Sequence, residues 1–128
     1  VFTPTILVQD ILDQFDQSLF KDSSKTFLDN SCGDGQFLSE VLIRKVENDI
    51  NFETALRTIY GVDLMEDNVE LCRERLLSGR EDLRHIVERN IVTADALRYH
   101  YRFDGSPPYD PTPKEQQQKL FENLFETE

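Results

Sequence analysis

The sequence is short of cysteine, of basic residues and of long apolar runs. Its two cysteines, Cys32 and Cys72, lack the spacing of zinc ligands, so we expect no metal site and a reducing, cytoplasmic setting. No apolar run approaches the roughly 18 residues that a membrane span needs. Acidic residues outnumber basic ones by 25 to 14, for a net charge of −11. Because lysine and arginine provide most non-specific affinity for DNA, contact with DNA should be weak or indirect.

What the chain does contain is an alternation of two kinds of apolar segment. Some have apolar residues at helical spacing, and others are short apolar runs typical of buried strands. The expected helices are residues 5–16, 36–47, 51–57, 67–77, 81–88 and 115–125, and the expected strands are 25–29, 58–63 and 90–95. This order predicts an α/β fold with a parallel sheet of three or four strands, right-handed crossovers and helices on both faces. Residues 1–102 should form the α/β domain, and residues 103–128 a proline-rich loop and helix of the same domain.

Each expected strand ends in an acidic residue, namely Asp29, Asp63 and Asp95. Since the carboxyl ends of parallel strands meet at one edge of a sheet, these acids should line the edge where α/β proteins bind ligands. The first acid is followed by a tight turn with Gly33 and Gly35, and glycine lets a backbone approach a ligand closely. The sequence therefore predicts a ligand site at this edge.

The turn is not typical of a dinucleotide site or of a phosphate loop. Leu38 stands where the dinucleotide fingerprint needs its third glycine, and no Gly-Lys-Ser/Thr sequence is present. Asp63, at the end of the second strand, has the position of an acid that accepts the hydroxyls of a ribose. Asp29 or Asp34 can face a cationic group. A cofactor with a ribose and a cationic end fits these residues, and S-adenosylmethionine is such a molecule.

Four short segments together resemble the motifs of a known family. They are Phe2-Thr3-Pro4, Asp29-Asn30-Ser31-Cys32-Gly33-Asp34-Gly35-Gln36-Phe37, Gly61-Val62-Asp63-Leu64 and Ala94-Asp95-Ala96-Leu97. In order and spacing they are similar to those of S-adenosylmethionine-dependent DNA amino-methyltransferases, the adenine-N6 and cytosine-N4 type. The resemblance covers roughly residues 1–97 and implies the cofactor-binding half of a Rossmann-like class I methyltransferase, with three layers and a truncated sheet.

The resemblance also implies roles for individual residues. Thr3 and Pro4 would lie near the methionine carboxylate, and Asp29 and Gly33 near the rest of the methionine. Asp63 would hold the ribose. Leu64, Asp95 and either Ala96 or Leu97 would surround the adenine. The full set of cofactor-binding residues implied by the resemblance is Phe2, Thr3, Pro4, Asp29, Ser31, Cys32, Gly33, Asp34, Gly35, Phe37, Asp63, Leu64, Asp95, Ala96 and Leu97.

A possible catalytic motif follows in the tail, Ser106-Pro107-Pro108-Tyr109. It resembles the family's catalytic motif in its serine form, in which an acceptor holds the target amino group and Tyr109 stacks on an extruded base. In the family a buried apolar strand precedes this motif, whereas here only Phe103-Asp104-Gly105 does. Two interpretations stay open: a catalytic site that more protein completes, or a proline-rich turn.

The sequence therefore leads to one functional hypothesis and an alternative. The first is an S-adenosylmethionine-dependent DNA methyltransferase that is incomplete by itself or needs a partner subunit. The alternative is a non-catalytic S-adenosylmethionine-binding or interaction module, and methylation of a protein or a small molecule is a weaker third. Because a truncated sheet leaves an unpaired edge, we also expect self-association, with the C-terminal helix, residues 115–125, covering a neighbouring copy.

Overall fold

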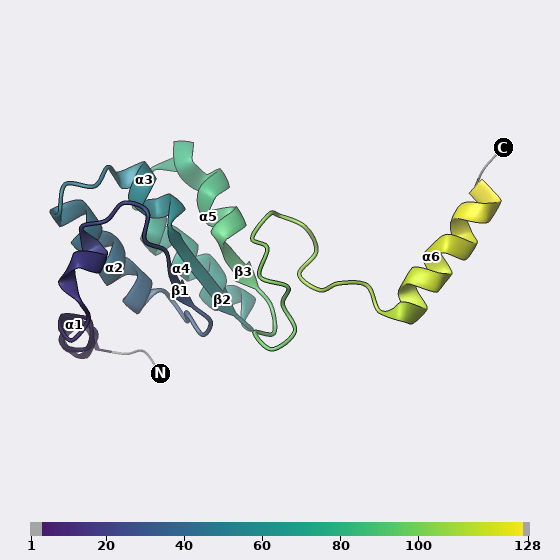
Figure 1. Ribbon diagram of the computed structural model, residues 1–128, viewed down its shortest axis with the longest axis horizontal. Coiled ribbons are helices and arrows are strands. Elements are labelled where there is room, and N and C mark those ends of the chain that lie inside the picture. The colour runs from purple at the N-terminus through teal and green to yellow at the C-terminus, as the bar shows by residue number, and fades with distance from the viewer. Residues whose placement is uncertain (1–3, 127–128) are drawn as a thin grey trace.

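A computed structural model of the protein describes residues 4–126 (Figure 1). Three strands form one parallel sheet in the order β1-β2-β3, with β1 at Phe27–Asp29, β2 at Ile59–Asp63 and β3 at Ile91–Thr93. Asp29 is in register with Gly61, and Asp63 with Thr93. The prediction of a mixed α/β fold with a parallel sheet is confirmed.

The helices begin and end where local signals place them. α2 starts directly after Gly35, whose φ of 93° lies in the left-handed region. α3 is capped by the Asn51 side chain, which accepts hydrogen bonds from the next turn. α4 ends at Ser78, which also has a left-handed backbone. The helices are α1 Thr5–Asp13, α2 Gln36–Glu47, α3 Phe52–Arg57, α4 Glu66–Leu77, α5 Arg84–Asn90 and α6 Pro113–Glu126, with short 3-10 turns at Gln17–Phe20 and Glu81–Leu83.

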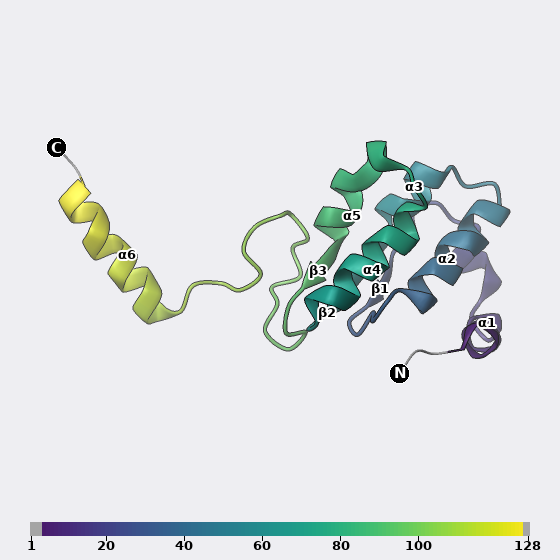
Figure 2. The same ribbon diagram turned by 180° about the vertical axis from the view of Figure 1, so that it is seen from behind.

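One face of the sheet carries the main core. Ile59 and Ile91 point into it, and the buried residues of α1 to α5 surround them. Figure 2, seen from behind, shows α2 and α4 in front of the strands. Both crossovers, from β1 to β2 and from β2 to β3, step in the same direction across the sheet. Crossovers of one hand that advance in one direction place their helices on one face, which explains the position of α2 and α4.

The opposite face has no helical layer among the described residues. Val62 and Ala94 form a second, smaller core there, which is covered by the aromatic segment, residues 99–109. Its covering side chains are Tyr99, Tyr101, Phe103 and Tyr109. The expectation of helices on both faces therefore differs from the structure, because aromatic rings of a loop take the place of the second helical layer.

A lysine is buried at the amino end of the sheet. The Lys45 ammonium on α2 donates hydrogen bonds to the carbonyl oxygen of Lys25 at 2.5 Å and to Thr58 Oγ1 at 2.7 Å. It also lies 5.2 Å from the centre of the Phe27 ring. Burial lowers the pKa of Lys45 below its usual value. These contacts join α2 to the starts of β1 and β2.

The last helix stands apart from the sheet. In Figures 1 and 2, α6 follows an extended linker and points away from α1 to α5. Leu120 on α6 is exposed, as are Leu28 on β1 and Ile6 on α1.

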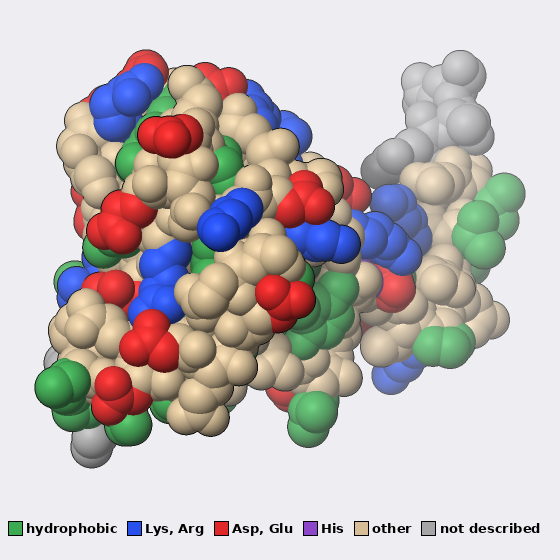
Figure 3. Space-filling view, turned by 60° about the vertical axis from the view of Figure 1, so that its left-hand side comes forward, with side chains coloured by type: hydrophobic (Ala, Val, Ile, Leu, Met, Phe, Trp, Pro, Cys, Tyr) green, Lys and Arg blue, Asp and Glu red, His purple; other side chains and the backbone are tan. Residues whose placement is uncertain are grey.

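Acidic and basic side chains are interspersed over the face shown in Figure 3. None of the helices within residues 4–126 combines the length and the apolar character needed to cross a bilayer.

Candidate functional site

Three acids lie at the carboxyl edge of the sheet, which is the lower edge in Figure 1. Asp29 is the last residue of β1, Asp63 is the last residue of β2, and Asp95 comes two residues after β3 ends. Because β1, β2 and β3 are neighbours in that order, the three acids form a staggered row along this edge. Asp29 is level with Gly61 and Asp63 with Thr93, so each acid is two residues further along than the one before. Such a row favours a ligand with several donor groups or a positive charge.

The glycine turn after β1 is held against β2. The Cys32 amide donates to the Val62 carbonyl at 3.0 Å, and the Gly33 amide donates to Asp63 Oδ1 at 3.2 Å. A Cβ at Gly35 would approach Cys72 Sγ to 2.8 Å, so this glycine is needed for close packing on α4. The turn is therefore built before any ligand arrives.

Asp63 receives three hydrogen bonds from the protein. Besides the Gly33 amide, Oδ2 accepts from the Met65 amide at 3.0 Å and from Asn68 Nδ2 at 3.2 Å. A carboxylate has about four acceptor positions, so at least one remains for a ligand. The carboxylate is thus held in one orientation while keeping the capacity to accept a hydroxyl.

Asp29 is partly buried at the end of β1, and this burial raises the pKa of Asp29 above its usual value. The hydrogen bond from the Ser31 amide, at 3.0 Å, opposes that effect, and the charge of Asp63 adds to it. Asp29 and Phe37 also line an apolar pocket of about 260 Å³ beside β1, with Leu12 and Phe15 of the α1 region. A cation beside Asp29 would relieve the repulsion between the two carboxylates.

Two residues of the turn point elsewhere. Asp34 is buried, and its Oδ2 accepts from Arg75 at 3.1 Å and from Gln36 at 3.3 Å. Arg75 also donates to the Asp34 carbonyl at 3.0 Å, so this carboxylate is already neutralised. The Cys32 thiol is buried as well, and a hydrogen bond with Cys72 together with burial raises the pKa of Cys32. Of the two acids considered for a cationic group, only Asp29 has no arginine partner among the residues that the structure describes.

Two exposed leucines stand beside the second and third acids. Leu64 follows Asp63 directly and is 69% exposed, and Leu97 follows Asp95 by two residues and is 96% exposed. Ala96, which lies between Asp95 and Leu97, is half-buried. Exposed apolar side chains on neighbouring loops, next to carboxylates, provide the kind of surface that a planar heterocycle covers.

The Ser106–Tyr109 segment lies on the β3 side of the site. Tyr109 Oη accepts a hydrogen bond from the Asp95 amide at 2.7 Å, and the Arg98 guanidinium lies 4.3 Å from the centre of the Tyr109 ring. Asp29 lies at the other edge of the sheet, two strands away. The structure therefore brings Ser106–Tyr109 together with Asp95, and not with Asp29.

The hydroxyl of Ser106 is engaged within its own loop. It donates to Asp104 Oδ1 at 2.5 Å and lies 3.2 Å from His100 Nε2. The Arg102 amide can only donate, so His100 Nδ1 accepts from it at 3.2 Å. His100 Nε2 then carries the proton and donates to the Pro107 carbonyl at 2.7 Å. In this arrangement His100 shapes the loop and cannot act as a base toward Ser106.

The remaining predicted residues have simple positions. Phe2 and Thr3 lie outside the described residues, and Pro4 caps the start of α1. Within residues 4–126, no group of three or more metal-ligating side chains is present. Sequence reasoning missed Asn68, which orients Asp63, and Arg75, which neutralises Asp34. Asn68 could have been suspected because it lies in the first turn of the helix that follows a strand-end acid.

Comparison with known proteins adds no family to this description. No protein-family model matches the chain, and no curated protein matches it either.

Proposed function

We propose that this chain binds S-adenosylmethionine along the carboxyl edge of its sheet. The observation that carries the proposal is the row of Asp29, Asp63 and Asp95, with the preformed glycine turn against Asp63. Asp29 would face the sulfonium and ammonium groups, and Asp63 would accept the ribose hydroxyls. Leu64 and Leu97 would cover the adenine, and Asp95 would accept a hydrogen bond from the adenine amino group.

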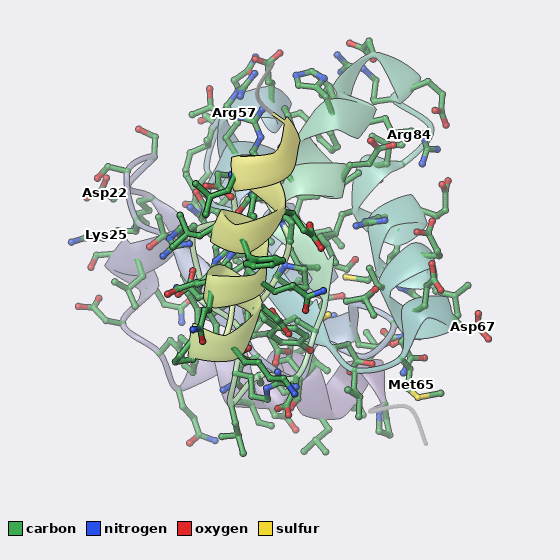
Figure 4. All side chains as sticks on the ribbon, turned by 90° about the vertical axis from the view of Figure 1, so that its right-hand side faces the viewer. Asp22, Lys25, Arg57, Met65, Asp67 and Arg84 are labelled. Atoms are coloured by element: carbon green, nitrogen blue, oxygen red, sulfur yellow. The ribbon has the colours of Figure 1, made fainter. Side chains whose placement is uncertain are left out.

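The cofactor part of the proposal is tested by calorimetric titration with S-adenosylmethionine and with its demethylated product. We expect binding to the wild-type chain and at least tenfold weaker binding to Asp63→Ala, since a hydrogen bond to a charged group contributes about 1.5–3 kcal/mol. Asp67→Ala is the matched control, because Asp67 is an exposed acid near the same loop (Figure 4). Equal affinities of wild type and Asp63→Ala would contradict the proposal.

A second variant guards against a folding defect, since Asp63 also holds the Gly33 amide. Leu64 is mostly exposed, so Leu64→Ala should fold normally and still bind the cofactor several-fold more weakly. Circular dichroism of each variant shows whether the fold is kept.

We further propose that the bound cofactor serves methylation of an amino group in DNA, with this chain as the cofactor-binding half of an amino-methyltransferase. The adenine-N6 or cytosine-N4 nitrogen would bond to the methyl carbon, the carbon–sulfonium bond would break, and the nitrogen would release a proton. Support comes from the Ser106–Tyr109 segment, which lies beside Asp95. A partner subunit would supply DNA recognition.

Transfer of a tritiated methyl group to DNA, with any partner subunit present, tests this second step. We expect incorporation into adenine or cytosine and its loss in Ser106→Ala. Absence of transfer, with cofactor binding intact, would leave the cofactor proposal standing and reject the DNA methyltransferase.

One observation favours the alternative, a non-catalytic module that binds S-adenosylmethionine. The Ser106 hydroxyl and the Tyr109 hydroxyl both make hydrogen bonds within the chain, so neither points freely at a substrate. This alternative predicts cofactor binding that depends on Asp63, without turnover under any condition.

A further inference from the structure

A cleft lies at the opposite end of the sheet from the three acids. It has a volume of about 330 Å³ and runs between α5, the end of α3 and the aromatic segment. Asn90 directly precedes β3, and Arg57 comes two residues before β2, so the cleft that they line is at the amino ends of these strands. Figure 4 shows Arg57 at one end of the domain and Met65, which follows β2, at the other.

The cleft is locally basic although the chain is acidic overall. Arg57, His85 and Arg89 line it together. Arg89 is exposed, and within residues 4–126 its guanidinium has neither an ion pair nor a hydrogen bond. Arg57 pairs with Glu53 at 3.2 Å, an exposed contact one helical turn away, and Asp82 lies near His85. An unpaired arginine is notable in a chain with a net charge of −11, because the eight ion pairs among the described residues use seven other arginines.

The same cleft exposes aromatic surface. The rings of Tyr60 and Phe103 lie 4.8 Å apart at an angle of 53°, and both are half-buried. Phe103 has a left-handed backbone with φ of 49°, which residues other than glycine rarely adopt. The Phe103 amide donates to Tyr99 Oη at 3.0 Å, which helps to hold this conformation. The ring is thus kept beside the arginines by the fold of the aromatic segment.

Aromatic rings beside arginines are the combination that binds nucleotides, since a base stacks on the rings and a phosphate meets the guanidinium groups. The volume is at the lower end of the range for small-ligand sites. We propose that this cleft binds a nucleoside phosphate, with the base against Tyr60 and Phe103 and the phosphate between Arg57 and Arg89. The site is separate from the carboxyl edge and does not depend on S-adenosylmethionine binding there.

The test is fluorescence anisotropy with a labelled oligo(dT) eight-mer, with unlabelled dTMP as competitor. Arg89→Gln should weaken binding at least fivefold and reduce the slope of log K against log salt by about 0.7, the value for one contact with a single strand. The control is Lys21→Gln, which removes the same charge from an exposed site beyond the cleft and should change affinity less than twofold.

The ring surface is tested separately with Tyr60→Leu. This variant should bind dTMP more weakly than the wild type, while its affinity for inorganic phosphate should be unchanged. Competition by dTMP as strong as by unlabelled eight-mer identifies a free nucleotide as the ligand, and at least tenfold weaker competition identifies a single strand. Equal loss of affinity in Arg89→Gln and Lys21→Gln would overturn the proposal, because only general charge would then matter. Absence of binding at millimolar dTMP and eight-mer would also overturn it.

Discussion

Asp29 illustrates how a carboxylate proposed to bind a ligand can reduce the stability of the fold. Its pKa is raised by burial and by the charge of Asp63, so the folded state binds a proton more tightly than the unfolded state does. The cost of ionising Asp29 in the folded state therefore builds up as the pH rises from 3.8 toward the raised folded-state pKa, and it is complete above that pKa. Below the ordinary value of 3.8 this cost disappears, because the carboxyl is protonated in both states.

We predict that Asp29→Asn stabilises the protein at pH 7 and weakens S-adenosylmethionine binding at least tenfold. The asparagine can still accept the Ser31 amide, while the repulsion from Asp63 is lost. Urea denaturation at pH 7 and at pH 3.5 measures the first effect, and the advantage of the variant should shrink at the lower pH. A variant that is less stable than wild type at pH 7 would contradict this account.

Gly61 is a residue at which an added side chain would meet a packed core. A Cβ there would approach Leu38 Cδ1 to 2.9 Å and Cys32 Cβ to 3.0 Å, in the middle of β2. We predict that Gly61→Ala lowers the free energy of unfolding by about 1–3 kcal/mol, the usual cost of overpacking. Urea denaturation of Gly61→Ala, Leu38→Ala and the double variant measures the coupling. Strictly additive losses would show that the Leu38 contact is not responsible.

At the scale of elements, the end of the aromatic segment, Ser106–Tyr109, is joined to the loop that follows β3. The contact between Tyr109 Oη and the Asp95 amide connects them directly. We predict that Tyr109→Phe costs about 1 kcal/mol of stability and speeds hydrogen exchange of the Asp95 amide, since a buried donor loses its acceptor. Arg98→Gln is the control, because it removes the cation over the ring but leaves the hydroxyl. Unchanged exchange in Tyr109→Phe would count against this connection.

The elements differ in how far the sequence predicts them. α2 begins and ends at the predicted residues, Gln36 and Glu47, because a left-handed glycine and a regular apolar stripe mark it. The parallel direction of the strands followed from the alternation alone, whereas their order within the sheet was not predicted. The aromatic segment was not predicted as a covering layer, since its partners Val62 and Ala94 come earlier in the sequence and no local pattern links them. The Asp34–Arg75 ion pair could not be predicted from the sequence either, because its two residues belong to different elements.

At the scale of the whole molecule, β1 is an open edge of the sheet. Leu28, its middle residue, is 52% exposed, and Phe15 beside the neighbouring pocket is 42% exposed. Open edges with apolar side chains favour pairing with another chain. We predict self-association that rises with concentration in analytical ultracentrifugation and falls in Leu28→Lys. Truncation after Thr112 tests whether α6 covers a neighbouring copy, and a strictly monomeric wild type at high concentration would contradict the prediction.

The order of the strands in the sheet is also their order along the chain. Each strand pairs with the one that precedes it in the chain, but partners such as Phe27 and Ile59, or Gly61 and Ile91, are separated by long crossovers. Such non-local parallel pairings form slowly. The domain should assemble in the direction of synthesis, and β1 and α2 should become stable only when β2 has paired with β1. The aromatic segment, which needs both Val62 and Ala94 in position, should close over the sheet last.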